Sequence, residues 1–187
     1  MLASRLVGCF VATSLAMVLL TASAKATTGS RIVSGYSESL VVATAQAGGM
    51  PSVIRGSLGG QSGGVLTDRV RAMLALPAYF PRAGFVAAPA AVEDGKGIRF
   101  VVLINPDNVI QAGQRLCGDL RGLSFGANAD RFVMLAALCR DTSTLTEVDV
   151  REAAVAGPDD ARFRRLLNEM MALAFPSAMR ERPTSGM

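Results

Sequence analysis

The chain has 187 residues, a formal net charge of +4, an aromatic content of 5%, and neither tryptophan nor histidine. The absence of histidine removes the usual general base at neutral pH and the commonest metal ligand. Basic residues are spread along the chain without clustering, so no nucleic-acid partner is expected. No calcium-loop, four-cysteine zinc or nucleotide-binding motif is present, and we predict neither a cofactor nor a metal.

The first 26 residues have the three parts of a secretory signal peptide. Arg5 supplies a positive charge, residues 6–20 contain no charged side chain, and a run of small residues follows. Two Ala-x-Ala sequences fit a cleavage site, and we favour cleavage after Ala26, with Ala24 as the alternative. The sequence therefore predicts export to the periplasm or cell envelope. An uncleaved membrane anchor is the alternative location.

Residues 6–9 (LVGC) match the form of a lipobox, in which the cysteine becomes lipidated. Cys9 lies before most of the apolar segment, whereas a lipidated cysteine follows that segment. We therefore interpret Cys9 as an apolar residue inside the signal peptide and do not expect its lipidation. A membrane partner is expected only if the N-terminal segment is retained or lipidated.

Two cysteines, Cys117 and Cys139, remain after the predicted cleavage. An even pair in a chain bound for an oxidising compartment predicts a disulfide bond. A redox pair of the Cys-x-x-Cys type is excluded by their wide separation.

The first half of the remaining chain shows six features. Residues 27–37 are small and polar and are expected to form a flexible lead-in to a single domain over 38–176. Short β-rich runs predict strands at 40–45 and 52–57, and the glycine-rich stretch 56–64 predicts a loop. Apolar residues at a helical period predict a helix capped by Thr67 and ended by Pro77, followed by a short strand at 84–88.

The second half contains the strongest signals. Two nearly all-apolar runs, 98–104 and 132–139, predict strands covered on both faces, with a long connection over 107–130 between them. Alternating valines and charged residues predict a half-exposed strand within 144–155. Residues 157–160 (GPDD) predict the start of a helix with one apolar stripe, which Pro176 ends.

The tail, 177–187, is expected to be disordered. The order of these elements predicts an α+β domain, in which an antiparallel sheet of about five strands has two helices packed on one face.

Several segments, including MPSVIRG (50–56), FVVLINP (100–106) and AGPDDARFRRLL (156–167), resemble a family of small exported, often lipoprotein-like, alphaproteobacterial proteins of unassigned function. The resemblance covers most of the chain after the signal peptide. It implies a signal peptide, a paired-cysteine core and a C-terminal helix, and it implies no activity. Many such proteins carry a properly placed lipobox cysteine, whereas this chain has only Cys9.

Two segments, 60–64 and 122–126, match the G-x-S-x-G pattern of serine hydrolases, with Ser62 and Ser124 as the serines. That chemistry requires a strand before the serine, a helix after it and a histidine that accepts its proton. Because the chain has no histidine, we do not predict a catalytic residue. The glycine-rich loop also lacks the motifs that cradle a phosphate, and a flexible connection is the simpler interpretation.

Arg55 and Arg99 lie within predicted strands, where arginine is unexpected. We expect both side chains to face the surface, and an anion-binding site is the alternative. The sequence as a whole predicts a non-enzymatic binding or accessory domain whose partner is an unknown envelope protein or ligand. The alternatives are a small envelope hydrolase that uses a serine of a G-x-S-x-G loop, or a membrane-anchored adaptor.

Overall fold

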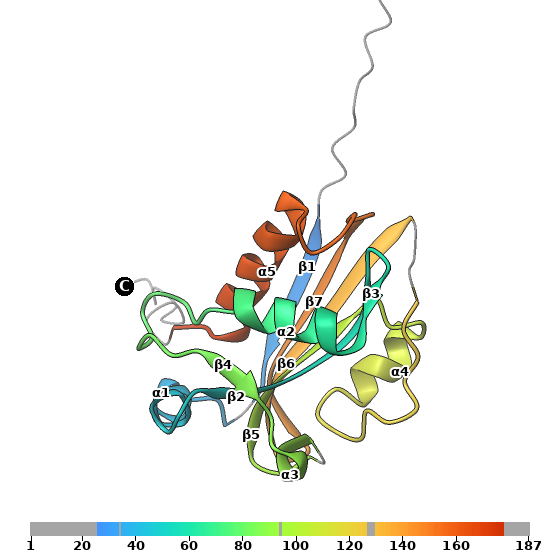
Figure 1. Cartoon of the computed structure of the whole chain (residues 1–187). Coiled ribbons are helices and arrows are strands. Elements are labelled where there is room, and N and C mark those ends of the chain that lie inside the picture. The colour runs from blue at the N-terminus through green and yellow to red at the C-terminus, as the bar shows by residue number, and fades with distance from the viewer. Residues whose placement is uncertain (1–25, 34, 94, 127–129, 178–187) are drawn as a thin grey trace, which may run out of the picture.

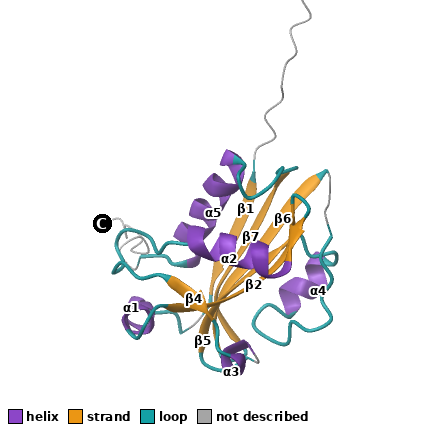
Figure 2. Cartoon of the chain, in the orientation of Figure 1, coloured by secondary structure: helices purple, strands orange, loops and turns teal. Residues whose placement is uncertain are grey.

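The computed structural model describes residues 26–33, 35–93, 95–126 and 130–177. These residues form a mixed α/β fold with one seven-stranded, mostly antiparallel sheet and five helices (Figures 1 and 2). Residues 1–25, with Cys9 and the alternative cleavage site at Ala24, lie outside the described residues, as do residues 178–187 of the predicted tail. No helix in the described part of the chain is long and apolar enough to span a membrane.

The strands are β1 (Thr27–Ile32), β2 (Met50–Leu58), β3 (Gln61–Ser62), β4 (Phe85–Ala87), β5 (Ile98–Ile104), β6 (Arg131–Arg140) and β7 (Ser143–Ala153). The helices are α1 (Glu38–Gln46), α2 (Gly63–Met73), α3 (Ala90–Glu93), α4 (Val109–Gln114) and α5 (Ala161–Ala174). The strand order is β1-β7-β6-β5-β2-β3, and β4 pairs with β2. The predicted strands at 52–57, 84–88, 98–104, 132–139 and 144–155 are confirmed as β2, β4, β5, β6 and β7.

The prediction of an antiparallel sheet is correct for most of the strand pairs, including β2–β3, but not for the pairs of β2 with β4 and β5. The pairs β5–β6, β6–β7 and β1–β7 are antiparallel, whereas β2 runs parallel to both β5 and β4. Parallel neighbours require a crossover connection, and the segment with α2 and β4 provides it between β2 and β5.

The sheet is covered on both faces, as the two apolar runs predicted, although the predicted helices accounted for only one of these faces. On one face, α2 and α5 pack over the apolar side chains of β2, β5, β6 and β7, as expected for the two predicted helices. On the other face, α4 and the segment that follows it cover β5 and β6 (Figure 1). The predicted connection over 107–130 therefore forms a third layer. This layer explains why the residues of β5 and β6 are apolar on both sides.

Two predictions near the N-terminus are wrong. Residues 27–32, expected to be part of a flexible lead-in, form β1 and pair with β7 along its whole length. Residues 40–45, expected to be a strand, lie in α1. The side chain of Ser37 caps this helix by accepting a hydrogen bond from the N–H of Leu40 (3.3 Å), and Val41 and Ala45, four residues apart, are its buried side chains.

The predicted glycine-rich loop is largely a tight hairpin between β2 and β3. Gly59 and Gly60 form the two-residue turn with φ of 57° and 75°, a conformation that favours glycine. Helix α2 then begins at Gly63, with Ser62 as its N-cap, and not at the predicted Thr67. Thr67 lies inside the helix, and its hydroxyl donates to the carbonyl oxygen of Ile54 (3.0 Å).

The predicted start of the last helix is confirmed within a few residues. Asp160 is the N-cap of α5, and its carboxylate accepts a hydrogen bond from the N–H of Arg162 (2.9 Å). Hydrogen bonds from the side chain and the backbone of Arg162 lower the pKa of Asp160 to about 2. The carboxylate is therefore charged at neutral pH, at the end of the helix where the macrodipole favours an anion.

The predicted disulfide is present. It joins Cys117, in the segment after α4, to Cys139 near the end of β6, with 5.5 Å between the two Cα atoms. Both cysteines are buried in the apolar core between the sheet and the layer formed by α4 and the segment after it. The bond thus fastens the covering segment to a central strand, and it is compatible with an oxidising compartment.

Replacing both cysteines (Cys117→Ala, Cys139→Ala) is expected to lower the free energy of unfolding by about 3 kcal/mol, because the unfolded chain loses a closed loop. Urea denaturation followed by circular dichroism measures the change. The same variant treated with a reductant serves as the control, since it has no bond to reduce. An unchanged denaturation midpoint would show that the bond does not hold the covering segment in place.

Candidate functional site

A cavity of about 340 Å³ lies at the outer edge of β2, and we call it the edge cavity. It is lined by Ile54, Arg55, Gly56, Ser62, Gly63, Thr67 and Phe125. These residues come from β2, β3, α2 and the segment that covers the second face of the sheet. The edge cavity therefore brings together one of the two arginines and one of the two serines that the sequence singled out.

The edge cavity exists because β2 has no partner strand along part of its outer side. On that side β4 pairs with Met50–Ser52 and β3 pairs with Ser57–Leu58, and no described strand pairs with 53–56. Backbone groups of alternate strand residues point to the same side. The carbonyl oxygen of Ser52 accepts from Ala88 on the outer side (3.2 Å), so the backbone groups of Ile54 and Gly56 also face outward.

Helix α2 lies across this part of β2 (Figure 1). Thr67 lies on this helix, and its hydroxyl donates a hydrogen bond to the carbonyl oxygen of Ile54. Gly56 has to be glycine, because a Cβ atom there would lie 2.5 Å from the carbonyl oxygen of Ile104. The N–H groups of Ile54 and Gly56 and the carbonyl oxygen of Gly56 remain on the outer side of the strand.

Arg55 is the charged group of the edge cavity. Its side chain is half-buried, and one guanidinium nitrogen donates to the carbonyl oxygen of Leu120 (3.4 Å). No carboxylate of the described residues forms an ion pair with Arg55, whereas nine other ion pairs are present in that part of the chain. The expectation that Arg55 faces the surface is thus replaced by a position in a cavity wall, with hydrogen-bonding capacity left for a ligand.

Ser62 lies at the junction between β3 and α2, where the chain turns from strand to helix. Its backbone is extended (φ −152°, ψ 175°), and its side chain does not cap the helix. The first N–H groups of an α-helix have no partner within the helix, and the dipole is positive at this end. Ser62 therefore contributes a hydroxyl to the cavity lining, beside Arg55, and Gly63 contributes the weakly positive start of the helix.

Most polar groups of the edge cavity are hydrogen-bond donors. The guanidinium of Arg55, the N–H groups of β2 and the start of α2 can only donate, and a hydroxyl donates or accepts. Phe125 supplies an apolar wall. A site with this balance is suited to an acceptor-rich, negatively charged group with an apolar substituent.

Arg99, the other arginine singled out by the sequence, was expected at the surface, and this prediction is wrong. Its side chain is 1% exposed, because α4 and the covering segment bury this side of β5. The guanidinium donates to the carbonyl oxygens of Cys117 (2.6 Å) and Asp141 (2.8 Å). Burial lowers the pKa of Arg99, and the nearby Asp141 carboxylate partly opposes this. Arg99 therefore holds the disulfide-bearing segment against β5.

Ser124, in the second G-x-S-x-G segment, does not join Ser62 in the edge cavity. Its side chain is exposed, and its carbonyl oxygen accepts from the N–H of Asp107 (3.0 Å). The next residue, Phe125, is the one that reaches the edge cavity. The two segments thus meet at this cavity through one serine and one phenylalanine.

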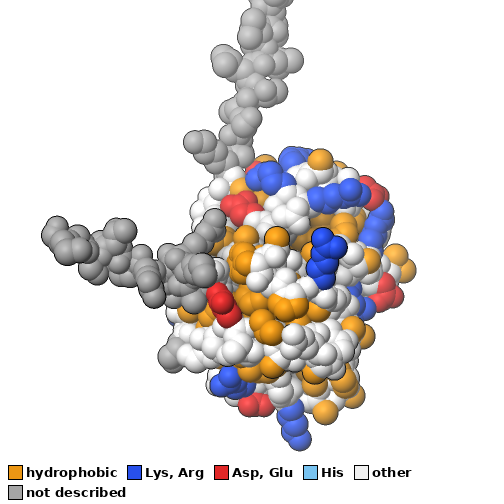
Figure 3. Space-filling view, turned by 90° about the vertical axis from the view of Figure 1, so that its left-hand side faces the viewer, with side chains coloured by type: hydrophobic (Ala, Val, Ile, Leu, Met, Phe, Trp, Pro, Cys, Tyr) orange, Lys and Arg blue, Asp and Glu red, His pale blue; other side chains and the backbone are white. Residues whose placement is uncertain are grey.

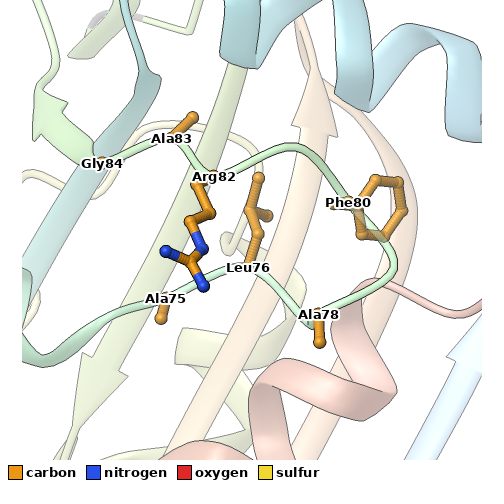
Figure 4. Close-up of a pocket in the computed structure, with 7 residues that line it drawn as sticks. All are labelled: Ala75, Leu76, Ala78, Phe80, Arg82, Ala83 and Gly84. Atoms are coloured by element: carbon orange, nitrogen blue, oxygen red, sulfur yellow. The ribbon is translucent and has the colours of Figure 1, made fainter.

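A separate cavity of about 580 Å³ lies inside the loop between α2 and β4, and we call it the loop cavity (Figure 4). Arg82 points between the two arms of the loop toward Ala75, and Leu76 points toward the opposite arm. Figure 3 shows hydrophobic side chains gathered near the middle of this side of the molecule. All the lining residues of the loop cavity, 75–84, belong to one loop, and Arg82 is exposed.

The edge cavity is the better candidate for a functional site. Its polar groups come from the consecutive elements β2, β3 and α2, Phe125 joins them from a distant segment, and strand pairing and helix packing fix their positions. Groups held by rigid elements are better organised for recognition than groups on a single loop. In the described part of the chain, no three acidic or cysteine side chains gather as a metal site would require.

No family model, curated protein or solved structure matches the chain. The resemblance to exported alphaproteobacterial proteins therefore stays a prediction. The candidate site is identified from geometry and chemistry alone.

The strand–serine–helix order at Ser62 allows a direct test of the hydrolase alternative. Because the sequence has no histidine, we expect no covalent labelling of the chain by a fluorophosphonate probe, measured by intact mass. Ser62→Ala is the matched control. Labelling of the wild type that disappears in this variant would contradict the expectation and establish an activated serine.

Proposed function

We propose that the chain is an exported envelope protein whose domain binds a negatively charged ligand in the edge cavity without transforming it. The observation that carries the proposal is the position of Arg55, half-buried in a cavity wall and without an ion-pair partner among the described residues. Taking a guanidinium out of water costs free energy unless other groups replace its hydration. A ligand carboxylate or phosphate would provide that replacement.

Three observations support export. The first 26 residues have the pattern of a signal peptide, two cysteines remain after it, and those two cysteines form a disulfide. The first described strand, β1, begins at Thr27, directly after the favoured cleavage site. The proposed location is the periplasm or another part of the cell envelope.

The mass of the processed protein tests the location. When the full chain is expressed in a bacterial host, we expect a soluble product that begins at Thr27, or at Lys25 if the alternative site is used. Intact-mass spectrometry of the soluble and membrane fractions distinguishes these products. An intact N-terminus in the membrane fraction would instead support an anchored adaptor, and a lipid mass on Cys9 would contradict our interpretation of that residue.

Replacement of Arg55 tests the ligand-binding role. We expect inorganic phosphate and acetate to shift the NMR signals of the Arg55 guanidinium and of the Gly63 and Gly64 amides, titrated into wild-type protein at constant ionic strength. The variant Arg55→Gln is expected to bind both anions on the order of tenfold more weakly, because it loses a charge-assisted hydrogen bond.

Arg164→Gln is the matched control, since it removes the same charge from an exposed position on α5. We expect this variant to bind like the wild type. Equal weakening in both arginine variants would show that net charge, and not the edge cavity, attracts the anions. Thermal denaturation of each variant verifies that Arg55→Gln is folded.

A further inference from the structure

We infer that β1 pairs with β1 of a second copy of the chain, in antiparallel orientation, so that the sheets of the two copies become continuous. The interaction surface is the free side of β1, which lies at one end of the strand order. The edge cavity lies beside β2, near the other end of that order. The inference therefore stands independently of the anion-binding role proposed above.

The first argument is that the free side of β1 is uncovered. The N–H of Val33 donates to the carbonyl oxygen of Leu145 (2.8 Å), and backbone groups alternate sides along an antiparallel pair. The N–H and carbonyl groups of Thr28, Ser30 and Ile32 therefore point away from β7, where no described strand pairs with them. Five of the six residues of β1 are exposed.

Helix α5 packs on one face of the sheet and leaves this side of β1 free. It lies over β6 and β7, and its Glu169 accepts a hydrogen bond from the hydroxyl of Thr28 (3.2 Å). Thr28 is accordingly the half-buried residue of β1. The strand has neither proline nor lysine, and its pairing with β7 has no register shift. Proline, lysine and bulges are the usual means by which a protein keeps an edge strand from pairing with another chain.

The second argument is that the free side of β1 is complementary to itself. A twofold axis through Ser30 places Ser30 opposite Ser30 of the second copy, and Thr28 opposite Ile32. Each outward donor then meets an outward acceptor, because the three outward residues are evenly spaced about Ser30. The side chains of Thr28 and Ile32 share a face in this register, and both are β-branched residues that suit a sheet.

The third argument is the glycine at position 29. Glycine within a strand weakens it, and the fold of a single copy does not require one here. Gly29 does not have a positive φ, and a Cβ atom at this position would meet no atom within 4 Å. A glycine in a strand often marks the place where another group approaches closely.

A surface hollow of about 270 Å³ lies beside Gly29 and accommodates an arginine of the second copy. The hollow is lined by Gly29, Ser30, Arg31, Glu147 and Asp149. In the register about Ser30, Gly29 lies opposite Arg31 of the second copy, and Asp149 lies directly across from Gly29 on β7. The Arg31 side chain of the second copy can cross the glycine toward the Asp149 carboxylate, over two strand spacings of about 10 Å in total. Twofold symmetry forms this contact twice.

The two copies of α5 do not obstruct this arrangement. The β7 strands of the two copies would lie three strand spacings apart, about 14 Å. Packed helices lie about 8–10 Å apart, so helices over the two β7 strands do not collide. The contact is confined to the paired strands and the hollows beside them. It is smaller than the interface of a permanent dimer, and we expect association to depend on concentration in the micromolar range.

Sedimentation velocity over a series of micromolar concentrations tests the pairing, with the purified product of the full chain. We expect the mass to rise from that of one copy toward that of two. Gly29→Lys is expected to weaken association on the order of tenfold, because each dimer then has two lysines opposite Arg31. Within its own chain the lysine lies across from Asp149 in open space, so the fold is kept, as thermal denaturation verifies.

Gly84→Lys is the matched control. It makes the same change at another exposed glycine, next to β4, where a Cβ atom also meets no atom within 4 Å. We expect this variant to associate like the wild type. Equal weakening in both lysine variants would show that added charge, and not the pairing of β1, decides association.

Cysteine cross-linking tests the register. In a pair about Ser30, the two Cα atoms of residue 30 lie about 5.5 Å apart, a distance that a disulfide spans. We expect Ser30→Cys to form a linked dimer under mild oxidation, seen on a non-reducing gel. Thr28→Cys is the control, since its two copies are offset by four residues, about 13 Å. Cys117 and Cys139 are bonded to each other and do not compete.

Three results would overturn the inference. The first is a mass of one copy at every concentration. The second is a dimer that Gly29→Lys leaves unchanged and Ser30→Cys does not cross-link, because it would use another surface. The third is cross-linking of Thr28→Cys in preference to Ser30→Cys, because the strands would then pair in another register.

Discussion

The double-sided burial of β5 and β6 is the constraint on which the rest of the structure depends. Every residue of β5 after Ile98 is buried, and so is every residue of β6 between its two terminal arginines. Strands of this kind need cover on both faces. α2 and α5 cover one face, and α4 with the disulfide-bearing segment covers the other. The cover on the second face is short and irregular, and Arg99 and the Cys117–Cys139 bond fasten it to the two central strands.

The edge cavity lies where the two covering layers, one on each face of the sheet, end at β2. The two layers meet at β2, where α2 arrives from one face and Phe125 from the other. Neither layer supplies a strand that pairs with residues 53–56, although Thr67 of α2 donates to the carbonyl oxygen of Ile54, and the short strands β3 and β4 lie on either side of that stretch. A half-buried arginine and two donors of β2 therefore face a small volume that no other part of the described chain fills.

The sequence predicted what depends on long local patterns and missed what depends on contacts between distant segments. The runs at 98–104 and 132–139 are apolar throughout, and the helix before Pro176 has a single apolar stripe, so each element could be identified by itself. Residues 27–32 have few apolar side chains, and only pairing with β7 makes them a strand. The short run at 40–45 fits a strand or a helix equally well. Its capping residue, Ser37, was the signal that favoured the helix. The sequence singled out Arg55 and Ser62, but nothing local indicated that they share a cavity or that Arg99 is buried.

The position of β1 bears on the proposed processing of the chain. Ala26 is the favoured cleavage residue, and the strand begins at the next residue with no spacer. A signal peptidase acts on a locally extended, accessible chain, whereas β1 is held by backbone bonds to β7. If cleavage occurs after Ala26, the peptidase and the sheet compete for the same few residues. In that case the strand next to the cleavage site would complete its pairing with β7 only after the peptidase had released it.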